Sequence, residues 1–161
     1  MQWRISHGRP SLRNRPKMAK REFAEALDSI RSQDPRYARD AYFFLRDGLD
    51  FTIKLRKKHK DGSTHVTGPQ LLDGLRQFAL KEFGPMVPTV FAYWGVACCE
   101  DFGEMVFNLI EAGIFGKTEQ DTIDDFKGGY TFHEAFIAPF VPEKPAVHHR
   151  LSASLPAQKL S

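Results

Sequence analysis

Two adjacent cysteines, Cys98 and Cys99, have the most obvious capacity for chemistry in this chain. They fall where a helix is predicted to begin, and backbone amides at a helix start can lower the pKa of a thiol. Glu100 and Asp101 follow directly and would repel a thiolate. The pair also lacks the C-x-x-C spacing that is typical of zinc and redox sites. We therefore interpret both cysteines as packing and capping residues.

Three histidines, His59, His65 and His133, lie within the predicted domain, and none has a spacing typical of metal ligands. His65 would suit a general base, but no nucleophile or orienting acid lies near it in the sequence. An acidic cluster could hold magnesium, although a capped and solvated short helix explains it better: Glu119, Asp121, Asp124 and Asp125. The sequence contains neither a phosphate-binding glycine loop nor a nucleophile elbow. It therefore predicts no cofactor and no metal, and it favours a protein that is not an enzyme.

The run from residue 54 to residue 60, KLRKKHK, is the densest basic patch of the domain. Basic side chains complement the carbonyl end of a helix, and such a run is usually a solvated helix end. It could instead contact phosphates or an acidic protein surface. Arg56, Lys57 and Lys58 are therefore the candidate binding residues of this sequence.

The formal net charge of +3 is unevenly distributed along the chain. Residues 1–17 carry +5 and residues 141–161 carry +2, which leaves −4 for residues 18–140. A protein that binds duplex nucleic acid normally presents a basic surface. The acidic domain therefore disfavours nucleic acid as a partner.

Composition divides the 161 residues into one domain with an extension at each end. Residues 1–17 mix arginine, proline and glycine without apolar periodicity, which predicts a basic disordered arm. We expect translation to begin at Met18, because the sequence MAKREFAEAL leads straight into a helix. Residues 141–161 have the composition of a disordered tail. Residues 18–140 then form a single helical domain.

The chain has no apolar run near the length of a membrane span and no apolar signal core at its start. The two adjacent cysteines cannot close loops, so nothing favours an oxidising compartment. We therefore expect a cytoplasmic protein without a membrane partner.

Apolar residues at helical spacing predict a mainly α fold, a compact bundle built around the second helix. Asp34 and Pro35 are expected to start that helix as its cap and first turn, and Gly84-Pro85 and Gly95 to end the third and fourth. Capping boxes are expected at Thr67 with Gln70, Thr118 with Asp121, and Thr131 with Glu134. The expected helices cover about residues 20–33, 35–58, 68–83, 87–94 and 99–113, with short helices around residues 126 and 136.

The segment 114–132 is expected to form either short helices or a small hairpin. Three helices followed by a hairpin is the element order of a winged helix, whose last helix enters the DNA major groove. The helix over 99–113, however, would carry four acids and no basic residue: Glu100, Asp101, Glu104 and Glu111. The fold is thus predicted to be winged-helix-like in part, without reading DNA through that helix.

Several short strings between residues 20 and 137 resemble a family of small conserved proteins of planctomycetes and verrucomicrobia whose function is not characterised. The strings are residues 41–44, 67–72, 94–95, 100–104, 108–113, 117–119 and 124–126. The resemblance implies a self-standing intracellular domain of bacterial origin, and it carries over no catalytic or binding residue.

The leading hypothesis is a non-enzymatic protein-interaction or regulatory module, because aromatic and capping residues account for most of the distinctive positions. Its partner would be another protein or a second copy of the chain. The first alternative is a nucleic-acid- or ribosome-associated protein that uses the basic patch. The second is a small enzyme whose site is assembled from residues distant in sequence.

Overall fold

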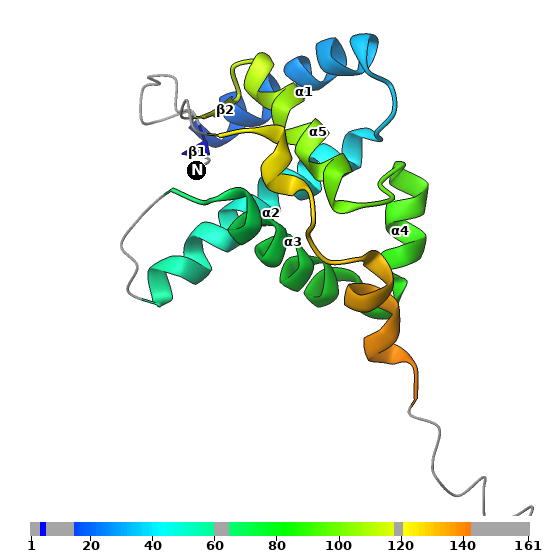
Figure 1. Ribbon diagram of the computed structural model, residues 1–161. Coiled ribbons are helices and arrows are strands. Elements are labelled where there is room, and N and C mark those ends of the chain that lie inside the picture. Colours follow the sequence, from blue (N-terminus) through cyan, green and yellow to red (C-terminus); the bar gives the residue numbers. More distant parts are fainter. Residues whose placement is uncertain (1–3, 6–14, 60–64, 118–120, 143–161) are drawn as a thin grey trace, which may run out of the picture.

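The computed structural model describes residues 4–5, 15–59, 65–117 and 121–142, and for residues 4–5 and 15–19 the backbone alone (Figure 1). Within these ranges, none of the helices combines the length and apolar character that crossing a bilayer demands. The elements are β1 (Arg4–Ile5), α1 (Arg15–Gln33), α2 (Arg39–Lys58), α3 (Gly68–Phe83), η1 (Gly84–Met86), α4 (Val87–Trp94), α5 (Cys99–Glu111), β2 (Phe115–Gly116), η2 (Ile123–Phe126), η3 (His133–Ile137) and η4 (Ala138–Phe140).

The mainly α fold that the sequence predicts is confirmed. The described part of segment 114–132 contains the short helix η2 and no hairpin of its own. Strand β2 pairs instead with β1, antiparallel, with Ile5 opposite Phe115. The arm predicted over residues 1–17 thus supplies β1 and the first turn of α1, and its other residues lie outside the described ranges.

The predicted start of the second helix is wrong by four residues. Residues 34–38 form a loop, and α2 begins at Arg39 after Ala38, which has extended backbone and makes no side-chain cap. Asp34 does not cap α2, because its carboxylate is hydrogen-bonded to the Arg36 side chain two residues along. A local ion pair therefore replaces the expected helix cap.

Other capping predictions are confirmed. Thr67 and Gln70 form a reciprocal capping box at the start of α3, with the Gln70 amide hydrogen donated to Thr67 Oγ1 and the Thr67 amide hydrogen to Gln70 Oε1. Thr131 and Glu134 form the same arrangement before η3. The box predicted at Thr118 lies outside the described residues. Each box satisfies amides that the first helical turn leaves unpaired, and so fixes where the helix begins.

Aromatic rings from four helices meet in the centre of the molecule. The ring of Phe44 in α2 lies 5.6 Å from that of Phe91 in α4 and 6.3 Å from that of Phe102 in α5. The Phe91 ring lies 5.3 Å from that of Phe136 in η3. Edge-on and tilted pairs at such distances add about 0.5–1.5 kcal/mol each to the burial of the rings. We call Phe44, Phe91, Phe102 and Phe136 the aromatic cluster; it joins α2, α4, α5 and the C-terminal helices.

Helices α2 and α3 lie side by side and make the largest contact between elements. Two glycines allow the close approach. A Cβ atom on Gly74 would overlap the side chain of Thr52, whose Cβ would be 2.7 Å away, and a Cβ atom on Gly48 would overlap Leu75. Thr52 is buried, and its hydroxyl donates to the Gly48 carbonyl at 2.7 Å. At these two points a side chain of one helix therefore packs directly against the glycine backbone of the other.

Replacing Gly74 by alanine should destabilise the fold. Alanine favours a helix by about 1 kcal/mol over glycine, but overpacking against Thr52 costs about 1–3 kcal/mol and the neighbour has little room to move. We expect a net loss in the free energy of urea unfolding of up to about 2 kcal/mol. Asp73→Ala, an exposed change on the same helix, should alter it by less than about 0.5 kcal/mol. Stabilisation by Gly74→Ala would contradict the packing described.

Candidate functional site: an uncharged apolar surface

The basic candidates Arg56, Lys57 and Lys58 occupy the last turn of α2. Lys57 and Lys58 are exposed, whereas Arg56 is half-buried. Cations at this position lie next to the unpaired carbonyls of the helix end, which they stabilise. The structure therefore accounts for the basic patch by its place on the helix, and it leaves two exposed amines that could meet an anionic partner.

The cysteines are placed as packing and capping residues. Cys99 is buried and its thiol donates to the Tyr130 carbonyl at 3.2 Å, while Cys98 is exposed before α5. Burial, and next the charge of Glu100, raise the pKa of Cys99 to about 12. Burial also raises the pKa of Cys98. Both thiols therefore stay protonated near neutral pH, which is the opposite of what a nucleophilic cysteine requires.

The histidines and the acidic cluster are not brought together. His59 and His133 are exposed at the end of α2 and the start of η3, and His65 is half-buried before α3. Among the described residues, no three of the side chains histidine, cysteine, aspartate or glutamate gather as metal ligands would. Asp124 pairs with Lys127 at 2.7 Å, and Asp125 accepts the Thr122 amide hydrogen at the start of η2. Glu119 lies outside the described residues.

A polar network ties the loop 34–38 to α5. The Asp34 carboxylate accepts hydrogen bonds from Arg36 Nε at 2.8 Å, from Arg36 Nη2 at 2.7 Å and from the Asn108 amide at 3.0 Å. Tyr37 donates its hydroxyl to Asp101 at 2.6 Å. The second oxygen of Asp101 accepts the backbone amides of residues 97 and 98. The network thus holds the start of α2 and the start of α5 in one place.

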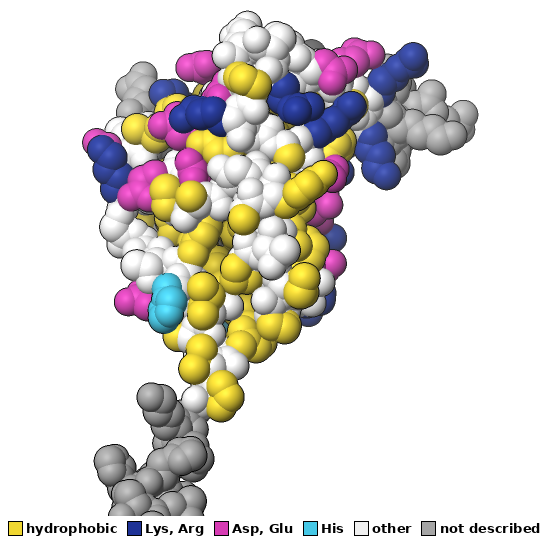
Figure 2. All heavy atoms as spheres, turned by 90° about the vertical axis from the view of Figure 1, so that its right-hand side faces the viewer, with side chains coloured by type: hydrophobic (Ala, Val, Ile, Leu, Met, Phe, Trp, Pro, Cys, Tyr) yellow, Lys and Arg dark blue, Asp and Glu magenta, His cyan; other side chains and the backbone are white. Residues whose placement is uncertain are grey.

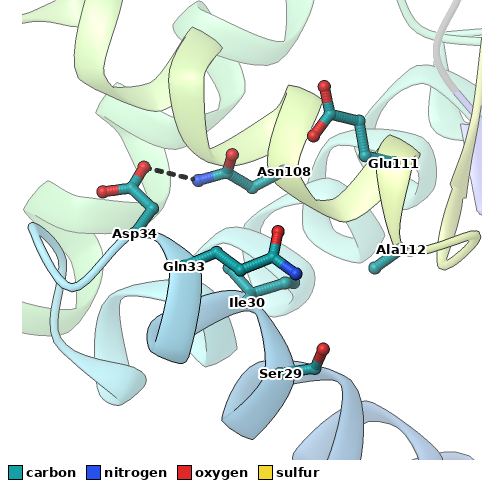
Figure 3. Close-up of a pocket in the computed structure, with 7 residues that line it drawn as sticks. All are labelled: Ser29, Ile30, Gln33, Asp34, Asn108, Glu111 and Ala112. Atoms are coloured by element: carbon teal, nitrogen blue, oxygen red, sulfur yellow. Dashed lines mark hydrogen bonds between the residues drawn. The ribbon is translucent and has the colours of Figure 1, made fainter.

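A shallow cavity of about 140 Å³ adjoins this network between α1 and α5 (Figure 3). Sites for drug-sized ligands usually measure about 300–1,000 Å³, so this volume suits a few water molecules or a small ion. In Figure 3 the Asp34 and Asn108 side chains point toward each other and are joined by a hydrogen bond. The lining residues are Ser29, Ile30, Gln33, Asp34, Asn108, Glu111 and Ala112.

The Asp34 carboxylate in this cavity is not suited to acid–base chemistry at neutral pH. The hydrogen bonds from the Arg36 guanidinium lower the pKa of Asp34 well below its usual value, although burial acts in the opposite direction. A general acid or base works best with a pKa near the operating pH. Asp34 therefore stays ionised and serves as an anchor for the loop.

The eight residues of α4, VPTVFAYW, carry apolar side chains on two adjacent stripes. Val87, Phe91 and Trp94 form the inner stripe and are buried against the aromatic cluster. The second stripe repeats the same spacing one residue earlier, which turns it by about 100° around the helix axis. It consists of Val90 and Tyr93 on α4 and of Met86, the last residue of η1. Met86 and Tyr93 are exposed, and Tyr93 keeps 85% of its surface accessible to solvent. The two ends of the second stripe therefore lie on the outside of the fold, while Val90 between them is half-buried against the core.

Three residues at the C-terminal end of the described chain extend this stripe. Ile137, Phe140 and Val141 are between 39% and 59% exposed, and η3 contacts both η1 and α4. Figure 2 shows hydrophobic side chains gathered over α4 and the short C-terminal helices, down to where the described chain ends. We call Met86, Tyr93, Ile137, Phe140 and Val141 the apolar surface. They are also the large hydrophobic side chains that are exposed among the described residues.

The apolar surface is built from two stretches of sequence that lack charge. Residues 83–99 contain no charged side chain between Glu82 and Glu100, and residues 135–142 contain none between Glu134 and Glu143. Charged residues make up 27% of the chain as a whole. The fold brings both uncharged stretches to the same end of the molecule, because η3 packs against η1 and α4.

This surface was not predicted from the sequence. The overlooked signal was the absence of charge over residues 83–99, since a surface helix of a monomer normally carries charged residues on its outer side. The length of α4 was a second signal. A helix of eight residues that contains Val87, Val90, Phe91, Tyr93 and Trp94 cannot turn all of these side chains toward one core.

No protein-family model matches the chain, and no curated protein or solved structure is similar to it. The family resemblance drawn from the sequence therefore stays a proposal, and the functional argument rests on the geometry of the apolar surface.

Replacing Asp34 by asparagine should weaken folding in a pH-dependent way. The pKa of Asp34 is lowered in the folded state, so its contribution to stability is present above the unfolded value of about 3.9 and is lost as the pH falls below it. We expect the free energy of unfolding to fall by about 1–2 kcal/mol at pH 7. The effect is small because Arg36 is half exposed and solvent screens the ion pair. Urea unfolding of both proteins at pH 7 and pH 3 measures this difference.

At pH 3 the two unfolding curves should move closer together. Asp47→Asn is the matched control, since Asp47 is exposed and pairs with its sequence neighbour Arg46 on the surface of α2. It should shift the unfolding free energy by less than about 0.5 kcal/mol at either pH. An Asp34→Asn effect that is equal at both pH values would show that the carboxylate charge does not hold the loop.

Proposed function

We propose that the protein is a non-enzymatic interaction module that recruits or regulates a protein partner through the apolar surface. The observation that carries the proposal is the outward stripe of α4, where Tyr93 keeps most of its surface in solvent. A helix with apolar residues on more than one face is normally buried. A large exposed apolar patch on a folded domain typically marks a contact site.

The residue types on this surface are those that protein interfaces favour. Tyrosine, phenylalanine and methionine are enriched at the centres of interfaces, while lysine and glutamate are depleted there. Tyr93 can bury its ring and keep its hydroxyl hydrogen-bonded to a partner or to water. Charged residues flank the two uncharged stretches in sequence, among them Lys81, Glu82 and Glu134. An apolar centre with a charged edge is the usual anatomy of a protein interface.

A second candidate function rests on the basic helix end. Lys57 and Lys58 are exposed on the last turn of α2 and could contact phosphates. A nucleic-acid- or ribosome-associated role would then show binding that weakens steeply between low and physiological salt. The acidic residues of α5 oppose a DNA-reading role for that helix, since Glu100 and Glu111 are exposed there. We place this candidate behind the protein-interaction role.

A photo-crosslinking amino acid that replaces Tyr93 tests the proposal inside the cells that naturally express the protein. Tyr93 is exposed, so the replacement leaves the core unchanged. We expect a protein adduct from position 93 that disappears when Met86 and Phe140 are both replaced by serine. Position 50 on α2, an exposed aspartate, is the control and should give no adduct.

An adduct that forms from position 57 and not from position 93 would contradict the proposal in favour of the basic helix end. A further set of proteins with Lys57 and Lys58 changed to glutamate separates the two surfaces. The adduct from position 93 should persist in that variant, and circular dichroism should show the same helix content in all of the proteins compared.

A further inference from the structure

We infer that the occupant of the apolar surface is a second copy of this chain, packed across a two-fold axis at α4. The inference rests on the proposed function, since it takes the apolar surface as the contact site and names what covers it. Three features carry it: the spacing of the exposed residues on α4, the distribution of charge, and the area available.

The spacing suits a contact between two copies of the same helix. Met86 ends η1 at the N-cap of α4 and lies seven residues before Tyr93, with Val90 between them, so the two exposed side chains stand about two turns apart. A two-fold axis that crosses the helix near its middle makes the two α4 helices antiparallel. Met86 of one copy then meets Tyr93 of the second copy, twice. Sulfur–aromatic contacts of this kind are favourable.

The charge distribution favours this face for self-association. The domain from residue 18 to residue 140 carries a net charge of −4 within a chain whose net charge is +3, and charged residues of both signs make up 27% of the chain. Residues 83–99 and 135–142 carry no charge. Two copies that meet through these stretches bring no like charges into direct contact, and an uncharged face also offers nothing to select an acidic or a basic partner.

The available area fits a weak dimer. Large aromatic side chains bury roughly 150–250 Å² each, so the exposed fractions of the five residues correspond to at most about 400–700 Å². Exposed small neighbours on the same elements add to the contact: Pro85, Thr89, Ala138 and Pro139. Together they approach the roughly 800 Å² per partner of a standard interface. We therefore expect a dissociation constant of about 1–100 µM rather than an obligate dimer.

Sedimentation equilibrium of the full chain tests the inference. The weight-average mass should rise from that of the 18.4 kDa monomer toward twice that value as the concentration increases across about 1–300 µM. Tyr93→Glu should weaken the dimer at least about tenfold, because it places a carboxylate against an apolar side chain at both contacts. Tyr93→Phe keeps the ring and should dimerise like the unchanged chain. Asp50→Lys, on the exposed side of α2, should not lower the association constant.

A charge-swap experiment tests the antiparallel pairing. Met86→Lys and Tyr93→Glu should each weaken self-association. Mixing the two variants should restore a heterodimer, because the lysine introduced at position 86 of one chain then meets the glutamate introduced at position 93 of the other. The second contact of that heterodimer remains Met86 against Tyr93. Failure of the mixture to associate, with the unchanged chain dimeric, would overturn the antiparallel contact at α4.

The outcomes separate this inference from the proposed function. A chain that stays monomeric at about 300 µM, while a crosslinker at position 93 still gives an adduct with a different protein, overturns the second copy and leaves the interaction module standing. A monomer whose crosslinker at position 93 captures residues 143–161 of the same chain, or captures lipid, also overturns it. A chain that stays monomeric and gives no adduct at position 93 contradicts both the contact between copies and the proposed interaction module.

Discussion

The aromatic cluster is the interaction on which the rest of the structure depends. Phe44 on α2 and Phe91 on α4 place rings from helices distant in sequence within 5.6 Å of each other. Phe102 and Phe136 close the cluster from α5 and η3. Large rings bury much area each, so a domain of this size needs no disulfide to hold its helices together. The cluster also fixes the rotation of α4, because Phe91 and Trp94 must face inward.

That rotation determines which side chains of α4 are exposed to solvent. Because Phe91 faces inward, Tyr93 faces solvent. With only eight residues, α4 has no further turn that would place polar side chains beside Tyr93. The loop before α2 supports the same arrangement. The Ala38 amide donates to the Trp94 carbonyl at 3.0 Å, and Gly95 takes a positive φ of 81° where a Cβ atom would overlap the Arg36 carbonyl. The orientation of α4 is therefore held from the core and from its C-terminal end.

The presence of the helices could be predicted from the sequence, because apolar spacing and capping boxes are patterns between residues close in sequence. Thr67 with Gln70 marked the start of α3, and Gly95 marked the end of α4. The start of α2 was missed because Asp34 forms a hydrogen-bonded ion pair with Arg36 instead of a cap, and sequence alone does not rank those two uses of a carboxylate. The apolar surface was missed for a different reason. Whether Tyr93 and Phe140 face the core or solvent depends on packing between segments that lie more than forty residues apart.

The most direct test of the account is an amide NMR spectrum of the full chain, recorded at low and high protein concentration. We expect the amide signals of Met86, Val90 and Tyr93 and of residues 137, 138, 140 and 141 to shift with concentration, while those at the end of α2 near Lys57 stay in place. Shifts confined to the end of α2 would assign the contact to the basic patch and contradict a contact through the apolar surface. A spectrum that does not change with concentration would contradict the contact between copies.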